Sequence, residues 1–522
     1  MSSQLQGFKQ SCTAARKWRA LRGLPQNQLQ HRRNQLLPNG RVQVGFCTTK
    51  SVTLSNIKEL KELVGEDAVL TDPEEIASYN VDWLGQYKGN SKVVIRPKTT
   101  EHVSQVLAFC NRERIGVVPQ GGNTGLVGGS VSLGENEIVL SLSRMDEILS
   151  FDDVSGVLVC EAGCVLEKLN DYVKTRGFVM PLDLGSSGTC MIGGNVASNA
   201  GGIRFMRYGS LHTNVLGLET VLPDGTVLDL LSSLRKDNTG YDIKQLFIGS
   251  EGTLGVITKV ALATPASSSS HNVAVLGLKN YDTVALCIAR AREYMGEILS
   301  ACEYWDEKSM ELVSENLDIK EPFSQRHPFY LLFETSGSDN EHDVEKMNRF
   351  IESICTEPGI LDGVMAQDMK QIDELWSIRE NITVALKDAK GFTYKYDLSL
   401  PKVKAMNETT FAVQEAIQRS YKYPEAKVLQ FGHVFDGNLH LNVWNPCYSL
   451  ELKELIEDTA YTYVAKNRGS ISAEHGIGQL KISKLGYSKP EGAIDLMGGI
   501  KQLFDPNKIM NPFKVLPPAN SR

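Results

Sequence analysis

Clusters of glycine between residues 119 and 255 constrain this chain more than any other feature of its sequence. They occupy four segments, 119–129 (PQGGNTGLVGG), 185–189 (GSSGT), 193–202 (GGNVASNAGG) and 249–255 (GSEGTLG). Glycine costs conformational entropy on folding, so such clusters indicate backbone that needs positive φ angles or the close approach of several N–H groups to an anion. Any one loop could instead be a set of tight turns. Four together predict an anion site of the size that a pyrophosphate needs.

The standard nucleotide motifs are missing from these segments. None reads G-x-G-x-x-G, and the chain has no Gly-Lys pair for a phosphate loop, so the Rossmann and P-loop folds are disfavoured. Short β-rich runs alternate with the loops from 92 to about 264, and the small polar stretch 265–272 (PASSSSHN) indicates a domain boundary. We therefore predict an α+β chain with a helical segment at 51–91, a nucleotide-binding domain at 92–270, and a second α+β domain at 271–522 with a largely antiparallel sheet.

The first part of the chain has the composition of a targeting segment. No Asp or Glu precedes Glu59, although ten Lys and Arg do. Such an Arg-rich, acid-poor leader predicts a mitochondrial transit peptide over residues 1–50 and a location in the matrix. The alternative is a basic arm that binds nucleic acid, but the net charge of −7 and the lack of a further basic cluster argue against it. Ten cysteines without a C-x-x-C pair fit a reducing compartment, and the apolar stretches are too short for a transmembrane segment.

The glycine-rich segments, together with RYGSLHTNVLGLE, resemble the FAD-binding domain of the vanillyl-alcohol-oxidase or p-cresol-methylhydroxylase type. In that family the first and last loops surround the FAD pyrophosphate and the middle ones line the flavin, which implies a two-part FAD-binding domain at 92–270. Members that bond the flavin covalently carry a His where this chain has Asn123, so the resemblance implies non-covalent FAD. The implied cofactor-binding residues are Pro119, Gly121, Gly122, Asn123, Thr124, Gly125, Gly128, Gly129, Ser186, Gly188, Thr189, Gly193, Gly194, Asn195, Asn199, Gly201, Gly202, Glu251, Gly252, Gly255 and Ile257.

A hairpin in the second domain brings two of the nine histidines together. In VLQFGHVFDGNLHLNVW (428–444) the Asp-Gly dipeptide at 436–437 is a strong two-residue turn signal. With that turn at the tip, His433 pairs with His440 across the strands. Asn442 then shares their face. Leu439, Leu441 and Val443 point to the opposite face, into the core.

Paired imidazoles form a divalent-metal site if a third ligand is available, and SAEHGIG (472–478) offers the Glu474 carboxylate. Two His and one carboxylate leave coordination positions open. An open metal site suits a 2-hydroxy acid, because the ion can hold the hydroxyl and one carboxylate oxygen and lower the pKa of the hydroxyl. His475 is the natural base for that proton, and hydride passes from C2 to the flavin. The alternative is that the two histidines only pack as an aromatic pair.

The motifs GHVFDGNLHLNV, SAEHGIG and DPNKIMNP, with LWSIRENIT and YKYDLSLP, resemble those of FAD-linked D-2-hydroxy-acid dehydrogenases. The resemblance covers nearly everything from 92 to 515. One departure is the pair Val434-Phe435, where smaller residues are expected. The resemblance implies His433, His440 and Glu474 as zinc or other divalent-metal ligands, Asn442 and His475 as substrate-facing residues, and Arg379, Thr383 and Lys395 as carboxylate binders.

The substrate prediction depends on the cationic residues. Arg379 and Thr383 are spaced i, i+4 on a predicted helix and could hold one carboxylate together, while Lys395 lies in a β-like run. A dicarboxylate needs a second cationic contact that lactate does not. We therefore expect FAD- and metal-dependent oxidation of D-2-hydroxyglutarate to 2-oxoglutarate, with D-lactate or malate as the alternative substrate. If Arg379 and Lys395 are only solvated surface charges, this preference has no basis.

Two readings from other classes stay open at this point. The chain could be a flavin-binding protein without turnover, or a metal hydrolase whose glycine-rich domain only binds a nucleotide. No NAD-type motif is visible, so the family resemblance implies electron-transferring flavoprotein or a quinone-linked carrier as the electron acceptor. The sequence leaves the oligomeric state open, with a homodimer as one option.

Overall fold

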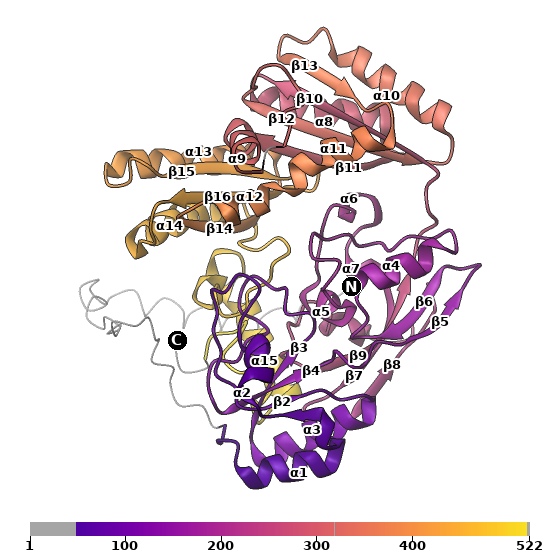
Figure 1. Cartoon of the computed structure of the whole chain (residues 1–522), viewed down its shortest axis with the longest axis vertical. Helices are drawn as coiled ribbons and strands as arrows, with labels where there is room; N and C mark the ends of the chain where they lie inside the picture. Colours follow the sequence, from indigo (N-terminus) through magenta and orange to yellow (C-terminus); the bar gives the residue numbers. More distant parts are fainter. Residues whose placement is uncertain (1–48, 318, 519–522) are drawn as a thin grey trace, which may run out of the picture. The chain divides into compact units, whose positions relative to one another are not determined.

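The computed structural model describes residues 49–317 and 319–518 (Figure 1). The predicted transit peptide therefore lies almost entirely outside the described residues. No helix in the described ranges is long and apolar enough to cross a membrane. All eight cysteines in these ranges are unpaired, as expected for a chain without a disulfide framework.

The first domain begins with a short helical segment and continues as two sheets with helices. Its helices are α1 (Leu54–Val64), α2 (Pro73–Ile76), α3 (Thr100–Glu113), α4 (Leu166–Lys174), α5 (Ile192–Ser198), α6 (Phe205–Tyr208) and α7 (Leu211–Asn214), and its 3₁₀ helices are Glu66–Ala68, Ala77–Asn80 and Ile243–Leu246. Its strands are β1 (Val69–Leu70), β2 (Val94–Ile95), β3 (Gly116–Gln120), β4 (Glu137–Ser141), β5 (Ile148–Asp152), β6 (Val157–Glu161), β7 (Val215–Val221), β8 (Val227–Leu230) and β9 (Val256–Ala263).

The two sheets of this domain confirm the predicted two-part architecture. A four-stranded sheet has the order β1-β2-β4-β3, with β4 parallel to both of its neighbours, and a five-stranded antiparallel sheet has the order β5-β6-β9-β7-β8. Helix α3 shows why these segments fold as they do. Its residues Val103, Val106, Leu107 and Cys110 recur at helical spacing and are buried. Both sheets share one hydrophobic core with this helix.

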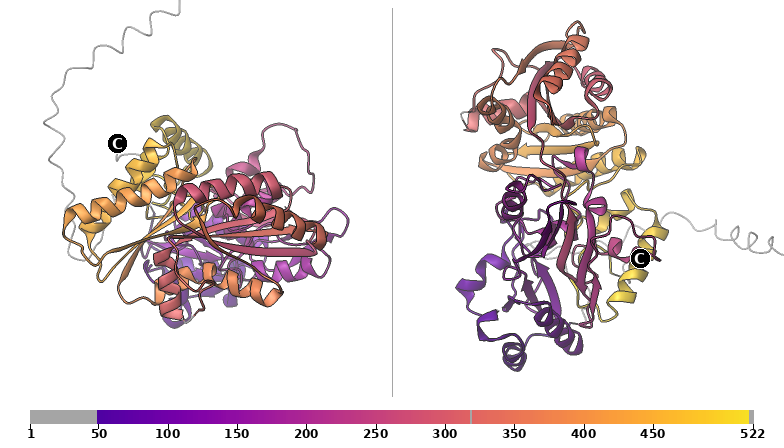
Figure 2. Two further views of the ribbon diagram at one scale, coloured as in Figure 1. Left: turned by 90° about the horizontal axis from the view of Figure 1, so that it is seen from above. Right: turned by 90° about the vertical axis from the view of Figure 1, so that its right-hand side faces the viewer.

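The second domain is built on one seven-stranded sheet (Figure 2). Its strands are β10 (Ser270–Leu278), β11 (Leu299–Asp306), β12 (Phe329–Gly337), β13 (Ile360–Met365), β14 (Phe392–Ser399), β15 (Lys427–His433) and β16 (Asn438–Asn445). Its helices are α8 (Tyr281–Met295), α9 (Glu307–Leu317), α10 (Asn340–Ile354), α11 (Met369–Glu380), α12 (Ile382–Asp388), α13 (Val403–Ser420) and α14 (Leu450–Lys466).

Every paired strand in this sheet is antiparallel, in the order β13-β10-β12-β11-β15-β16-β14, as predicted for the second domain. Helices α8, α10, α13 and α14 pack in the core on one face. Helices α9, α11 and α12 pack on the other. Both faces of this sheet are covered by helices, so polar side chains on either face must find hydrogen-bond partners inside the protein. The face under α11 and α12 carries a set of such polar side chains.

The chain returns to the first domain at its end, after a 3₁₀ helix (Ile482–Tyr487) and α15 (Glu491–Phe504). Ile509 and Met510 are buried in the core of the first domain. The Val117 backbone N–H of β3 donates to the Ile509 carbonyl at 2.8 Å, and the Asn511 N–H donates to the Val117 carbonyl at 2.8 Å. The last segment of the predicted 271–522 domain therefore completes the core of the first one.

Candidate functional site

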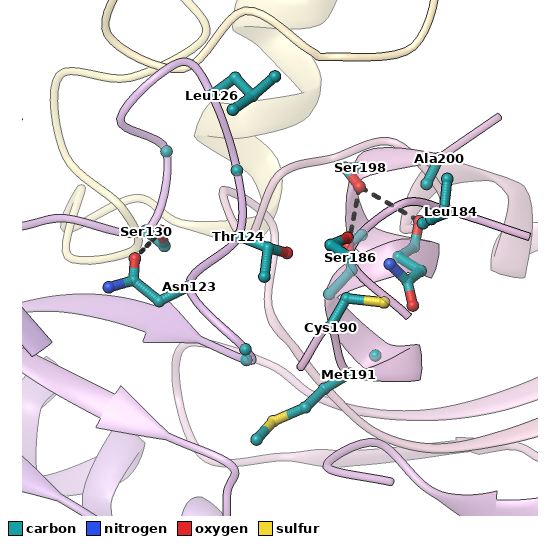
Figure 3. Close-up of a pocket in the computed structure, with 18 of the residues that line it drawn as sticks. Asn123, Thr124, Leu126, Ser130, Leu184, Ser186, Cys190, Met191, Ser198 and Ala200 are labelled. Atoms are coloured by element: carbon teal, nitrogen blue, oxygen red, sulfur yellow. Dashed lines mark hydrogen bonds between the residues drawn. The ribbon is translucent and has the colours of Figure 1, made fainter. Parts of the chain in front are cut away.

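A cavity of about 490 Å³ lies among the glycine-rich loops of the first domain (Figure 3). Its volume is in the range of cofactor-binding clefts, roughly 300 to 1,000 Å³. All but four of the predicted cofactor-binding residues line it. Of those four, Gly128 and Gly202 have positive φ, Asn199 ends α5 in the left-handed conformation, and Gly188 lies beside the Glu167 carboxylate. The loops predicted from four separate segments therefore meet at one cavity.

The glycines on this cavity are required for two different reasons. A Cβ on Gly122 would lie 2.0 Å from the Thr189 carbonyl oxygen, which is impossible, so here two loops approach too closely for any side chain. A Cβ on Gly125 or Gly194 would meet nothing within 4 Å, and both residues line the cavity. Close contact between loops and open backbone toward the cavity are both expected of a cradle for FAD. The residues present therefore fit that cofactor.

Replacement of Gly122 by alanine is expected to remove bound flavin, because the Cβ would force the 119–129 loop away from Thr189. We expect the purified variant to lose most of its flavin absorbance and to unfold at a lower temperature. Gly498→Ala is the matched control, since this glycine lies on α15 with nothing within 4 Å of the added Cβ. A Gly122→Ala protein with full flavin content would contradict the role of this contact.

Asn123 occupies the place where covalent members of the resembling family carry a His. It has φ 55°. Its side-chain N–H donates to the Val81 carbonyl at 2.7 Å, and its amide oxygen accepts from the Ser130 hydroxyl at 2.7 Å (Figure 3). Both ends of the amide are thus used to hold the loop. An amide cannot form a bond to flavin, so this position serves loop geometry.

Glu251, predicted to bind the cofactor, also joins the two halves of the site. It lines the cavity, and its two carboxylate oxygens accept from the backbone N–H groups of Ile477 and Gly478, each at 2.8 Å. Burial raises the pKa of Glu251, and these two donors oppose the increase. The glycine-rich 249–255 loop is thereby fixed to the SAEHGIG loop of the second domain.

Three imidazoles surround one oxygen of Glu474. The Nε2 atoms of His433 and His440 each lie 3.7 Å from Glu474 Oε1, and that of His475 lies 4.0 Å from it. Two ligands of one tetrahedral zinc ion are about 3.4 Å apart for bond lengths near 2.1 Å. The spacing of these atoms is close to that value, so a small movement of the side chains would bring them onto one ion. The donor set of nitrogen and carboxylate oxygen is the kind that Zn²⁺ binds.

The hairpin that carries the first two imidazoles has a different register from the predicted one. His440 pairs with Phe431 rather than with His433, and residues 434–437 form a four-residue turn in place of the two-residue turn. Gly432 has φ 150° and its Cβ position is 2.3 Å from the Asn438 carbonyl oxygen, so this strand bends where only glycine fits. A shift by two residues keeps every side chain on its predicted face. The rings of His433 and His440 still meet, with centroids 5.2 Å apart.

Asp397 on β14 completes a group of four possible ligands with His440, Glu474 and His475, whose donor atoms lie within 4.8 Å of one another. Its Oδ2 already accepts three backbone N–H groups, from 473, 474 and 475, at 2.8 to 2.9 Å. Its Oδ1 accepts from the Asn438 amide at 2.8 Å. These donors leave little capacity for a metal ion. Asp397 therefore anchors the SAEHGIG loop, and His433, His440 and Glu474 remain as the better ligand set.

Burial and charge give the imidazoles of this cluster opposite protonation behaviour. Burial lowers the pKa of His440 to about 3, with the neighbouring His433 adding to the effect. Burial also works against the charged form of His433, but Glu303 and Glu474 outweigh it and raise the pKa of His433. Burial raises the pKa of Glu474, but hydrogen bonding and attraction to His433 override it and hold that pKa at about 2. His440 is thus neutral and Glu474 ionised at neutral pH, the states in which they could bind a metal ion, whereas His433 would have to lose its second proton before its Nε2 could bind one.

Glu474 connects this cluster to the cavity. Its Oε2 accepts the Gly202 backbone N–H at 2.7 Å, and a Cβ on Gly201 would lie 2.6 Å from the same oxygen. Glu474 and His475 both line the cavity. The imidazole cluster therefore reaches the cavity through Glu474 and His475, while His433 and His440 lie behind them.

The structure separates the predicted carboxylate binders. Arg379 lies in the last turn of α11 and Thr383 in the first turn of α12, so they lie on two helices that meet at Asn381 rather than on one helix. Thr383 lines the cavity, whereas Arg379 is buried in an ion pair with Glu303, at 2.9 Å. Asn442 is buried and its amide donates to the His440 carbonyl at 3.2 Å. The Arg379 charge is thus already compensated within the protein.

Lys395 has an unusual environment. It lies on β14 opposite Asn442, two residues from Asp397 and on the same face of the sheet. Its Nζ is buried and finds no hydrogen-bond partner among the described residues. Burial, with repulsion from Lys387, lowers the pKa of Lys395 to about 8. A buried amine without a partner is costly, which is typical of a group that waits for a ligand.

Sequence reasoning missed three residues at this site. Glu303 and Asp397 are single carboxylates inside strands of the seven-stranded sheet. Glu303 lies in no motif, and Asp397 lies in YKYDLSLP without an assigned role. Trp83, which lines the cavity, is 45% exposed and has the Lys387 amine 4.5 Å from its ring centroid. The signal that could have identified Glu303 and Asp397 is that each is an acidic residue within a strand, β11 or β14, that pairs with a strand of the histidine hairpin.

Comparisons with known proteins agree with this arrangement. Residues 91–231 match the FAD binding domain family and residues 267–515 match the FAD linked oxidases, C-terminal domain. The chain is similar to D-2-hydroxyglutarate dehydrogenase, mitochondrial, of Bos taurus, with 51% identity over 87% of this chain and 82% of the relative. It is 49% identical to the protein of the same name from Arabidopsis thaliana, over 90% of this chain and 82% of the relative.

Among solved structures the fold is similar to p-cresol methylhydroxylase with substrate bound, with a TM-score of 0.71 and 15% identity, over 88% of this chain and 95% of that one. The fold and the two family matches together define an FAD-linked oxidoreductase with a vanillyl-alcohol-oxidase-type flavin domain. More narrowly, the chain belongs to the family of the FAD-dependent D-2-hydroxyglutarate dehydrogenases.

Proposed function

We propose that this protein oxidises D-2-hydroxyglutarate to 2-oxoglutarate with non-covalent FAD and a divalent metal ion. The observation that carries the proposal is the buried cluster of three imidazoles and Glu474, which reaches the cavity among the flavin-domain loops through Glu474 and His475. His433, His440 and Glu474 would hold the ion. Bound FAD would supply the acceptor for the hydride from C2, and the ion would supply a Lewis acid for the substrate oxygens.

His475 is proposed to take the hydroxyl proton. It lines the cavity and is 26% exposed, more than the other two imidazoles. Its Nδ1 lies 3.9 Å from Asp397 Oδ2, and its ring stacks on that of His440 with centroids 5.9 Å apart. An imidazole that reaches the cavity while its backbone N–H is bonded to Asp397 is held in one place. A fixed base beside the reacting carbon is what proton abstraction requires.

The dicarboxylate preference is proposed to depend on Lys395, with Arg379 and Thr383 in support. Lys395→Met is expected to raise KM for D-2-hydroxyglutarate by roughly 10- to 100-fold, because a hydrogen bond to a charged group contributes about 1.5 to 3 kcal/mol. The same variant should change the KM for D-lactate little, since lactate lacks the distal carboxylate. Lys308→Met is the control, because its amine already donates to the Val428 carbonyl at 3.2 Å, whereas Lys395 Nζ has no hydrogen-bond partner among the described residues.

Steady-state rates on a panel of D-2-hydroxy acids with an artificial electron acceptor test the substrate directly. We expect the highest kcat/KM for D-2-hydroxyglutarate. A preference for D-lactate or malate would move the enzyme to the alternative substrate. Bound flavin that no D-2-hydroxy acid reduces would leave a flavin-binding protein without turnover.

The cellular setting is part of the same proposal. The leader composition and the mitochondrial names of the relatives support a place in the mitochondrial matrix. Electron-transferring flavoprotein or a quinone-linked carrier is proposed as the acceptor. The test is the rate at which reduced enzyme is reoxidised. Faster reoxidation by these carriers than by oxygen or NAD would support the proposed acceptor.

A further inference from the structure

Glu303 is a fully buried carboxylate in the middle of the second domain. It lies on β11, between β12 and β15 in the seven-stranded sheet, and is 1% exposed. It pairs directly with His433 across the β11–β15 ladder, so the two side chains share one face of the sheet. A buried carboxylate is tolerated only where it is paired and hydrogen-bonded. The partners of Glu303 therefore show what it is for.

Each oxygen of Glu303 contacts a different functional side chain. Oε1 lies 2.6 Å from His433 Nδ1, and Oε2 accepts from the Nε and one terminal nitrogen of Arg379, both at 2.9 Å. The Arg379 guanidinium also lies over the Phe431 ring, 4.9 Å from its centroid. His433 comes from β15 and Arg379 from α11. One carboxylate thus fixes two side chains from two elements.

The contact with His433 determines which ring nitrogen is free. A carboxylate can only accept, so Nδ1 of His433 carries the hydrogen, and the Nε2 atom faces Glu474 Oε1 at 3.7 Å. A carboxylate behind a ligating imidazole fixes its orientation and makes the other nitrogen more basic. The contact with Arg379 cancels its charge inside the protein and holds the guanidinium beside the cluster.

We propose that Glu303 is a positioning residue that fixes the metal-binding His433 and the substrate-binding Arg379 through one carboxylate, so that metal affinity and substrate affinity both depend on it. This inference rests on the proposed function. It goes further by assigning one group to the organisation of both the metal and the substrate contacts. Glu303 itself does not line the cavity.

The test is the affinity of FAD-loaded protein for Zn²⁺, measured by competition with a chromophoric chelator. Glu303→Gln is expected to weaken Zn²⁺ binding by about 10- to 100-fold, the usual loss when an outer-shell partner of a ligand is removed. KM for D-2-hydroxyglutarate should rise as well. The N–H group of the glutamine amide would face the N–H groups of Arg379, and two donors cannot form a hydrogen bond. Flavin content and the melting profile report whether the variant is folded.

Glu334→Gln is the matched control. Glu334 lies on the same face of the neighbouring strand β12, but its carboxylate accepts from Trp376 Nε1 at 2.8 Å and from the Ser300 hydroxyl at 2.7 Å. Its Zn²⁺ affinity should equal that of the unmodified protein. Because Glu303→Gln leaves a buried guanidinium uncompensated, the double variant Glu303→Gln/Arg379→Met serves if the single variant does not fold. The weakened Zn²⁺ affinity should persist in it.

The outcomes separate the two proposals. Unmodified protein that binds no Zn²⁺ would refute the metal part of the proposed function. Unmodified protein that binds Zn²⁺ with the same affinity as Glu303→Gln or the double variant would refute the role of Glu303 alone. If Glu334→Gln loses as much Zn²⁺ affinity as Glu303→Gln does, then loss of any carboxylate from this face has the same effect. That result would also refute the specific role of Glu303.

Discussion

His475→Gln is expected to lower kcat for D-2-hydroxyglutarate by roughly 10²- to 10⁴-fold, the usual contribution of a positioned general base. The substitution keeps a polar side chain of similar length in the cavity but removes the group that can take the hydroxyl proton. Glutamine at this position still leaves the backbone N–H of residue 475 bonded to Asp397. The loop should therefore keep its place, and the loss should appear in the chemical step.

Rapid-mixing measurements of flavin bleaching by substrate would locate that loss. We expect slow reduction of the flavin in His475→Gln, with unchanged flavin content and Zn²⁺ affinity. His342→Gln is the control, since His342 also has a carboxylate neighbour, Asp343, 3.0 Å from its Nδ1, but lies on α10 and does not line the cavity. Flavin reduction at the normal rate in His475→Gln would assign the proton transfer to another group.

Removal of the metal ion is expected to abolish turnover and to leave FAD bound. The proposed ligands and the flavin cradle use different atoms. Glu474 is joined to the flavin-domain loops by the hydrogen bond that it accepts from the Gly202 backbone N–H, while the cradle itself is made by the 119–129 and 193–202 loops. Treatment with a chelator should therefore give protein that keeps its yellow flavin colour but is inactive, and added Zn²⁺ should restore the turnover rate.

His440→Ala should produce the same state permanently. We expect its kcat/KM to fall by at least about 100-fold, since loss of outer-shell partners alone costs 10- to 100-fold, and Zn²⁺ should not restore it. The His212→Ala variant is a suitable control, because His212 bonds Gln245 on the first domain. Normal turnover in His440→Ala, or loss of FAD on chelation of the unmodified protein, would contradict this assignment.

The parts of the site that depend on local chemistry could be predicted from the sequence. Glycine has few alternatives where loops approach as closely as Gly122 and Thr189 do, so the four loops indicated one cavity. The alternation of Leu439, Leu441 and Val443 with His440 and Asn442 gave the faces of β16 correctly, and all three apolar residues are in the core.

The parts that depend on contacts distant in sequence could not be predicted. The register of the histidine hairpin is set by the bend at Gly432 against Asn438, and a turn signal alone does not contain that contact. Glu303 and Asp397 become part of the site only because β11 pairs with β15 and β14 pairs with β16. The ion pair between Arg379 and Glu303 joins residues that are 76 positions apart in the sequence, so no local pattern indicates it.

The return of the chain end to the first domain has a consequence for synthesis of the protein. Domains generally fold in order as the ribosome releases them, the N-terminal one first. Here Ile509 and Met510 lie in the first domain's core, and the Lys514 amine donates to the Gly129 carbonyl of a cofactor loop at 3.0 Å. The flavin-binding half therefore cannot finish folding until almost the whole chain has been made. Stable FAD binding is therefore expected only after the segment with Ile509, Met510 and Lys514 has docked on the first domain.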